Sequence, residues 1–123
     1  MIKLTLQRIP FTVDADNRLR FLKARTGITP NILCRMGFCL SLEEPGIPKP
    51  IPEKAEMGRE INRFTLLGEY DLVYTHLLAT WIQENDPNSF QRELNDYFVA
   101  HMNRGVEILN ARIKGLTDLA KLI

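Results

Sequence analysis

The stretch Arg25-Thr26-Gly27-Ile28-Thr29-Pro30-Asn31-Ile32 ends one predicted helix and begins the next. Gly27 is a typical C-terminal stop, because glycine adopts the left-handed conformation without steric cost. Thr29 and Pro30 are typical of an N-cap and a first helical position. Acidic residues at positions 14 and 16 suit the start of the preceding helix, where the helix dipole is positive. The sequence therefore predicts a first helix that begins near residue 12 or 14 and stops at Gly27, and a second helix from about 29 to 42.

Upstream of these helices, residues 2–8 alternate apolar and polar side chains, as a half-buried strand does. The apolar positions would face a core: Ile2, Leu4 and Leu6. The polar positions would face outward: Lys3, Thr5 and Gln7. Pro10 would end this strand or confine it to a sheet edge.

A strand followed by two helices within residues 1–42 is similar to a ribbon-helix-helix module, in which strands of two subunits pair and enter the DNA major groove. One short strand cannot satisfy its own backbone groups, so we expect it to pair with a second chain. Base readout by Lys3, Thr5 and Gln7 is one interpretation of the alternation, and an ordinary edge strand is the other.

The remainder of the chain is predicted to be mainly helical. Residues 45–52 contain four prolines and predict an extended connection, either a surface linker or a docking segment for a partner. Residues 58–64 predict a short strand or loop. A third helix is expected over 69–84, with an apolar side formed by Leu72, Val73, His76, Leu77, Leu78, Trp81 and Ile82. A fourth is expected from about Ser89 through Phe90 to Ile113, with a kink or interruption at Gly105, and a last short helix after Gly115.

Size and composition predict one domain over residues 1–123. It is expected to be mainly α, with an N-terminal strand followed by a helix bundle. Its parts are a strand-helix-helix part over 1–42, the proline-rich connection over 45–52 and a helical part over 69–123. The 45% hydrophobic and 25% charged content is that of an ordinary globular protein. No segment approaches the ~20 apolar residues of a membrane span, and the start lacks a secretory signal, so we expect a cytoplasmic protein without membrane contact. Cys34 and Cys39 are expected to be buried thiols, because their spacing places them on different helix faces.

The net charge of +1 conceals an uneven distribution. Basic residues outnumber acidic ones before residue 43, whereas acidic residues dominate from 43 to 110. A basic end indicates an anionic partner such as nucleic acid, although a solvated surface explains the charges equally well. The candidate DNA-binding residues are Lys3, Arg18, Arg20, Lys23, Arg25 and Arg35. Side chains of this kind suit phosphate contacts that do not depend on DNA sequence.

No residue set is typical of an active site, and we expect no catalytic residue, metal or cofactor. His76 and His101 are isolated in the sequence, and a core or interface position is the simplest interpretation of each. The chain carries no phosphate-binding glycine loop followed by lysine, no nucleophile elbow and no cysteine cluster.

Two blocks of sequence resemble the DndE family, small bacterial proteins of the system that replaces a non-bridging oxygen of the DNA backbone with sulfur. The first block is Arg25-Thr26-Gly27-Ile28-Thr29-Pro30-Asn31-Ile32-Leu33-Cys34-Arg35 followed by Phe38-Cys39-Leu40-Ser41-Leu42-Glu43-Glu44-Pro45-Gly46. The second is Glu60-Ile61-Asn62-Arg63, Thr65-Leu66 and Gly68-Glu69-Tyr70-Asp71. The resemblance covers roughly residues 18 to 110, with the C-terminal tail from about Arg112 outside its strongest part.

The resemblance implies an accessory protein without catalysis of its own, which binds duplex DNA, nicked duplexes included. It implies a homo-oligomer, with a homotetramer as the expected form. The implied partners are other DNA sulfur-modification proteins: a cysteine desulfurase or sulfur donor, an adenylating iron-sulfur enzyme and an ATPase. The alternatives are an assembly adaptor that docks these proteins, a ribbon-helix-helix repressor and, last, an enzyme.

Overall fold

The computed structural model describes residues 3–89 and 94–122, so Ile2 of the predicted strand and Phe90 of the predicted fourth helix lie outside the described residues. The elements follow in the order β1 (Arg8–Thr12), α1 (Val13–Thr26), α2 (Pro30–Glu43), β2 (Met57–Asn62), α3 (Arg63–Leu67), a 3-10 turn (Gly68–Tyr70), α4 (Asp71–Asn85), a 3-10 turn (Pro87–Ser89), α5 (Leu94–Arg112) and a 3-10 helix (Leu116–Leu122). The mainly helical class with an N-terminal strand is confirmed.

The sequence predicts the boundaries of α1 and α2 well. The side chain of Thr12 accepts a hydrogen bond from the backbone N of Ala15, and Gly27 ends α1 with a φ of 76°. Pro30 occupies the first turn of α2, although the Thr29 side chain makes no capping hydrogen bond. The freedom of glycine and the fixed φ of proline are properties of the residues themselves, so these two helix ends need no tertiary contact to form.

The N-terminal strand differs from its prediction in both place and partner. It covers Arg8–Thr12, so Pro10 lies inside it rather than after it. It pairs antiparallel with β2 of the same chain, from Arg8 opposite Asn62 to Thr12 opposite Met57, with an irregularity between Pro10 and Thr12. Both strands of a two-stranded sheet are edges, which is where proline is tolerated. The backbone groups that led us to expect a second subunit are therefore paired within the chain, and the two-subunit ribbon is not confirmed.

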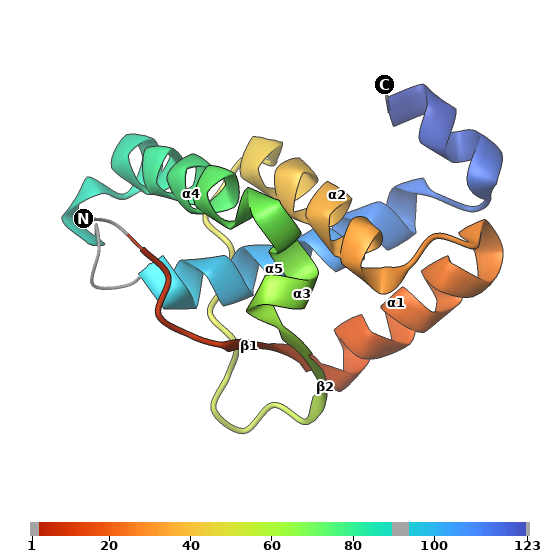
Figure 1. The fold of residues 1–123 in the computed structure, drawn as a ribbon, viewed down its shortest axis with the longest axis horizontal. Coiled ribbons are helices and arrows are strands. Elements are labelled where there is room, and N and C mark those ends of the chain that lie inside the picture. The colour runs from red at the N-terminus through yellow and green to blue at the C-terminus, as the bar shows by residue number, and fades with distance from the viewer. Residues whose placement is uncertain (1–2, 90–93, 123) are drawn as a thin grey trace.

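Helix α5 runs through the middle of the molecule, and the other elements surround it (Figure 1). Helix α2 crosses α5 where Gly37 meets Gly105, and a Cβ on Gly37 would lie only 2.7 Å from the Gly105 carbonyl group. α5 continues through Gly105 to Arg112, so the predicted interruption is wrong. The glycine serves close helix packing instead.

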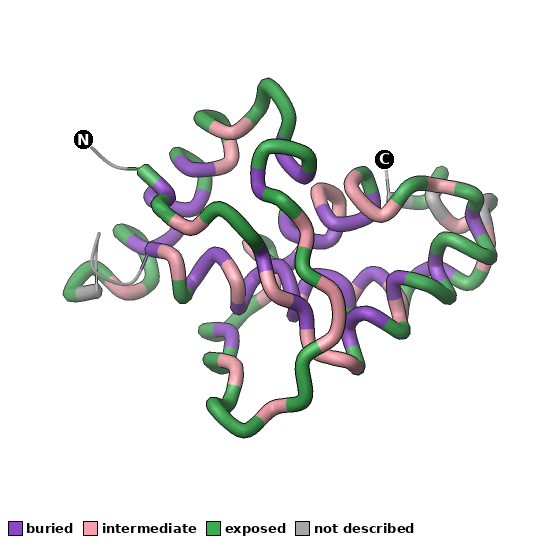
Figure 2. Tube along the Cα trace, turned by 60° about the horizontal axis from the view of Figure 1, so that its bottom comes forward, coloured by how far each residue is buried: buried purple, intermediate pink, exposed green. Residues whose placement is uncertain are grey.

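Buried residues of β1 and of the helices form the core around α5, whereas β2 has only half-buried and exposed residues (Figure 2). Aromatic rings of three helices meet there, with the Phe38 ring centroid 5.2 Å from that of Phe98. The largest fully buried side chains are Phe11, Phe38, Phe98, Ile9, Leu19, Leu22, Leu33, Leu66, Leu67, Leu78, Ile82 and Met102. Across the described residues, no helix combines the length and the hydropathy needed to cross a bilayer.

His101 belongs to this core, whereas His76 is exposed on α4. Ser41 Oγ accepts from Arg104 Nε over 2.8 Å and shares a second hydrogen bond with His101 Nδ1, also at 2.8 Å. His101 is neutral near neutral pH. Burial, together with the nearby Arg104 charge, lowers the pKa of His101 to about 3.

Helix α4 departs from the predicted amphipathic pattern. Its buried side consists of Thr75, Leu78, Ala79, Trp81 and Ile82. Leu72, Val73 and Leu77 were expected in the core but are 61%, 53% and 42% exposed. The helix is apolar on two sides, and packing against α3 and α5 covers only one of them.

Candidate nucleic-acid interface

The predicted basic cluster lies on α1, and we call Arg18, Arg20, Lys23 and Arg25 the basic surface of α1. The Thr12 cap and the Gly27 stop fix the ends of this helix. Leu19 and Leu22 are fully buried, which turns the other side of the helix, with its charged residues, toward solvent. A helix places residues three or four apart on one face, so the four bases divide into two pairs.

The first pair is Arg18 and Arg25, seven residues apart. Arg18 is half-buried and lies 3.6 Å from the Asp14 carboxylate and 3.9 Å from that of Glu107. Arg25 is exposed, and its Nη1 donates to the backbone oxygen of Ile113 over 3.4 Å. Within the described part of the chain, Arg25 pairs with no carboxylate. Arg25 is therefore the freer of the two for an external anion.

In the second pair, Arg20 and Lys23, Arg20 shares a carboxylate with an arginine that the sequence did not single out. Arg59 of β2 donates from Nε to Asp16 Oδ1 over 2.6 Å, and Arg20 Nε lies 3.4 Å from the same oxygen. Burial by itself would raise the pKa of Asp16, but the hydrogen bonds from the Arg59 side chain and backbone outweigh it and lower the pKa. Asp16 stays ionised and brings the two arginines together. Arg59 falls in the acidic half of the sequence, so only the fold joins it to α1.

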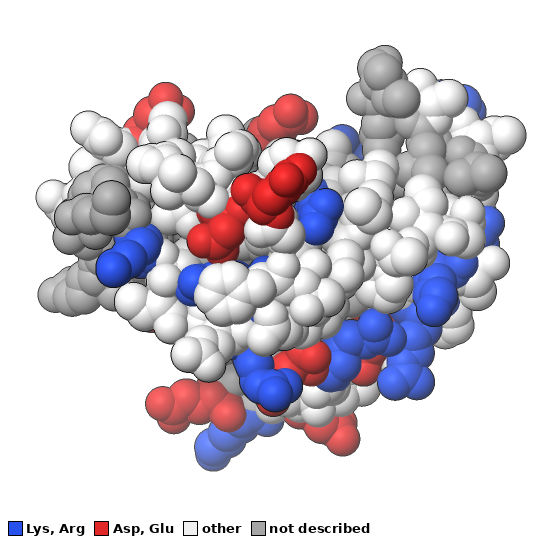
Figure 3. All heavy atoms as spheres, in the orientation of Figure 1, with Lys and Arg blue, Asp and Glu red and all other residues white. Residues whose placement is uncertain are grey.

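The result is a surface of mixed charge with a basic excess. Figure 3 shows Lys and Arg side chains gathered over α1 and the neighbouring end of β2, with a few acidic side chains between them. Lys23 and Arg25 are exposed, and Arg20 keeps 66% of its side chain accessible. Exposed, flexible cations of this kind suit phosphate oxygens without base selection.

The structure does not bring the other two predicted residues to this surface. Arg35 of α2 donates from Nε to the backbone oxygen of Leu66 over 2.6 Å, and its guanidinium lies 5.8 Å from the centre of the Tyr70 ring. These contacts hold α2 against α3, so Arg35 stabilises the packing of the two helices. Lys3 is exposed but precedes β1, and it lies outside the ribbon that would have carried it into a groove.

The repressor interpretation loses its geometric support for the same reason. Lys3, Thr5 and Gln7 lie before the strand rather than on its outer face. Thr5 is bound to α5, because its backbone N donates to Asn95 Oδ1 over 3.1 Å and its hydroxyl accepts from Asn95 Nδ2 over 2.6 Å. Leu4 is buried as expected. Arg63 anchors the segment by donating to the backbone oxygens of Leu4 and Leu6.

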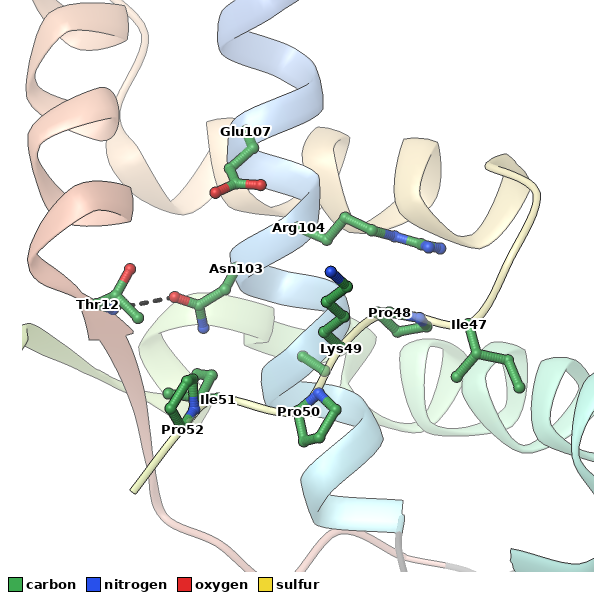
Figure 4. A pocket seen from close by; sticks show the side chains of 11 residues that line it. Thr12, Ile47, Pro48, Lys49, Pro50, Ile51, Pro52, Asn103, Arg104 and Glu107 are labelled. Atoms are coloured by element: carbon green, nitrogen blue, oxygen red, sulfur yellow. Dashed lines mark hydrogen bonds between the residues drawn. The ribbon is translucent and has the colours of Figure 1, made fainter. Parts of the chain in front are cut away.

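A hollow of about 500 Å³ separates the proline-rich segment from α5 (Figure 4). Two of its polar side chains on α5, Asn103 and Arg104, make hydrogen bonds that hold the fold together. Asn103 accepts from the backbone N of Thr12 over 3.0 Å and donates to the backbone oxygen of Pro10 over 3.1 Å. Arg104 donates to Ser41 and to the backbone oxygen of Gly46. These contacts position the segment and leave Lys49 as the accessible cation of the hollow.

Neither cysteine is poised for sulfur chemistry. Burial raises the pKa of Cys34 to about 12, and the partial burial of the Cys39 thiol raises its pKa as well. The thiolate is the reactive form, so both side chains stay protonated near neutral pH. Cys39 is exposed, contrary to expectation, and both cysteines are free. Among the described residues, no three His, Cys, Asp or Glu side chains group to hold a metal ion.

Comparisons with known proteins agree with the resemblance seen in the sequence. The family description "DNA sulphur modification protein DndE" matches residues 8–115. The crystal structure of DndE from Escherichia coli B7A, described as involved in DNA phosphorothioation modification, has a TM-score of 0.69 and 27% identity, and the match covers 87% of this chain and 99% of that one. The crystal structure of a DndE mutant involved in DNA phosphorothioation has a TM-score of 0.60 and 24% identity, and the match again covers 87% of this chain and 99% of that one. At this identity the match supports a common fold. A search of curated proteins gave no match. The chain belongs to the DndE family of DNA sulphur modification proteins.

Proposed function

We propose that this chain is a non-catalytic accessory subunit of bacterial DNA phosphorothioation, which holds duplex DNA, nicked duplexes included, through the phosphate backbone. The observation that carries the proposal is the basic surface of α1, where Arg20, Lys23 and Arg25 stay accessible after folding. Contacts to phosphates supply affinity without sequence preference. Such a subunit would present any modification site to the sulfur-transferring enzymes.

The decisive experiment measures how DNA affinity depends on salt for the variant Lys23→Glu/Arg25→Glu. A labelled duplex is titrated with protein at several salt concentrations, and fluorescence anisotropy gives the dissociation constant. Each lost phosphate contact should reduce the slope of log affinity against log salt by roughly 1. We expect a reduction of about 2, together with weaker binding to every duplex sequence tested.

The matched control is Lys49→Glu, which reverses an exposed charge on the proline-rich segment. It should leave the slope unchanged. Circular dichroism of both variants checks that the Arg25 contact to Ile113 is not needed for folding. Equal slopes for wild type and the α1 variant would refute the proposed surface, and no affinity of the wild type for any duplex at low salt would refute the function.

We further propose that copies of this chain self-associate through the apolar face of α4, formed by Leu72, Val73, His76, Leu77 and Thr80. These side chains line a shallow hollow of about 380 Å³. The surface over α4 is predominantly uncharged in Figure 3, so two copies can meet there without charge repulsion. A helix that is apolar all round is typical of a buried element, and a second copy would bury the side that the fold leaves open. Self-association would also multiply the phosphate contacts of one DNA complex.

The second candidate function is an assembly adaptor for the other modification proteins. The observation in its favour is the proline-rich segment, where Pro50 and Pro52 are exposed. Extended proline segments dock in aromatic-lined grooves. An adaptor would bind its partner proteins at low salt while showing no affinity for intact or nicked duplex, and the anisotropy experiment separates the two functions.

A further inference from the structure

We infer that Phe21 is a base-stacking side chain, which contacts the face of a DNA base that is not stacked within the duplex. The inference rests on the proposed DNA binding and specifies which DNA the basic surface of α1 would prefer. Phe21 is 56% exposed, whereas Leu19 and Leu22 on the same helix are fully buried. A single exposed apolar side chain is common, so the argument depends on what surrounds this ring.

The ring stands within the basic surface. Arg18 precedes Phe21 by three residues and Arg25 follows it by four, so both share its face of the helix. The guanidinium of Arg25 lies 6.0 Å from the centre of the Phe21 ring. The other neighbours on this face, Asn17 and Ala24, are short and exposed. The Arg25 guanidinium thus lies over one face of the ring, and more than half of the surface of Phe21 remains accessible to a flat ligand.

This combination matches one kind of ligand. A protein that binds unpaired nucleic acid pairs a positive track for the backbone with aromatic rings for the bases. Arg18 and Arg25 are seven residues apart, about 10 Å along the helix axis, which is about three backbone steps of 3.4 Å. This spacing suits phosphates on both sides of a base that lies against the ring, with Arg18 exchanging its contacts to Asp14 and Glu107 for one phosphate.

In an intact duplex the base faces are stacked on one another, and the ring has nothing to contact. A gap or an unpaired base exposes one face. The geometry therefore favours DNA that carries such a discontinuity, while the cations of α1 continue to bind intact duplex.

The test compares an intact duplex with the same duplex carrying a one-nucleotide gap and 2-aminopurine opposite the gap. Wild-type protein should bind the gapped duplex more tightly and change the 2-aminopurine fluorescence. Phe21→Leu should weaken binding to the gapped duplex about tenfold, the scale of one base-aromatic contact, and should abolish the fluorescence change. Its affinity for intact duplex should change less than twofold.

Phe64→Leu is the matched control, because Phe64 is 55% exposed and also lies against an arginine, 4.6 Å from the Arg63 guanidinium. It should bind both duplexes as wild type does. Equal loss on both duplexes, an unaltered 2-aminopurine signal, or a changed molecular mass of Phe21→Leu without DNA would each overturn the stacking role. If the wild type binds both duplexes equally, only this inference fails. If it binds neither, the proposed function fails with it.

Discussion

Replacing Gly105 with alanine tests the closest contact in the fold. A Cβ on Gly105 would overlap the carbonyl group of Gly37 and lie 2.8 Å from the backbone N of Phe38. Carbon contacts are ordinarily near ~3.5 Å, and backbone atoms cannot rotate away as a side chain can. Helices α2 and α5 would have to part by roughly 1 Å, which loosens the packing of Phe38 and Val106.

The expected cost follows from two opposing terms. Overpacking of a core costs about 1–3 kcal/mol, and a clash with backbone belongs at the upper end. Alanine in place of glycine regains about 1 kcal/mol of helix propensity. The net expectation is a loss of about 2 kcal/mol in the free energy of unfolding, or a melting temperature lower by roughly 10 °C. That is a large part of the stability of a domain of this size.

Urea unfolding provides the assay, with the fluorescence of Trp81, the single tryptophan, as the probe of the core. Gly115→Ala is the control, because a Cβ there meets nothing within 4 Å, and its midpoint should shift little. A Gly105→Ala protein as stable as wild type would refute the reasoning, since it would mean that the helices have room for a methyl group.

Two further perturbations test the buried histidine and the apolar face of α4. His101 has a folded-state pKa of about 3 against 6.5 for an unperturbed histidine, so the unfolded chain binds the extra proton first. The contribution of His101 to stability should level off above about pH 7.5 and fall as the pH drops toward 3, by at most about 1.4 kcal/mol per pH unit. His101→Gln should flatten that fall between pH 6.5 and 5 in urea titrations, and an unaltered slope would contradict the assignment. Leu72→Lys should lower the mass seen by analytical ultracentrifugation without lowering the melting temperature, because Leu72 is 61% exposed. Ile47→Lys, at an exposed apolar residue that does not belong to α4, should leave the mass unchanged, and equal masses for all three proteins would exclude α4 as the interface.

Part of the site was predictable because local chemistry defines it. The ends of α1 depend on Gly27 and on acidic residues in the first turn, and its exposed bases follow from the burial of Leu19 and Leu22. The family resemblance then indicated DNA as the ligand of these bases. The contacts of Arg35 with Leu66 and Tyr70 could not be predicted, because those residues are distant in the sequence, and its DNA binding stays a prediction. Arg59 was missed because β2 approaches α1 only in the folded chain.

The sequence by itself determined the ends of α1 and α2, since the backbone preferences of glycine and proline act within a few residues. Tertiary structure decided which strand pairs with which, that Gly105 permits a helix crossing rather than a break, and which side of α4 is covered. It also decided which cations remain free for an anion, because burial and ion pairing depend on neighbours that the chain brings together only when it folds. A local pattern can place a charge on a helix, but only packing determines whether that charge faces a carboxylate, a carbonyl or water.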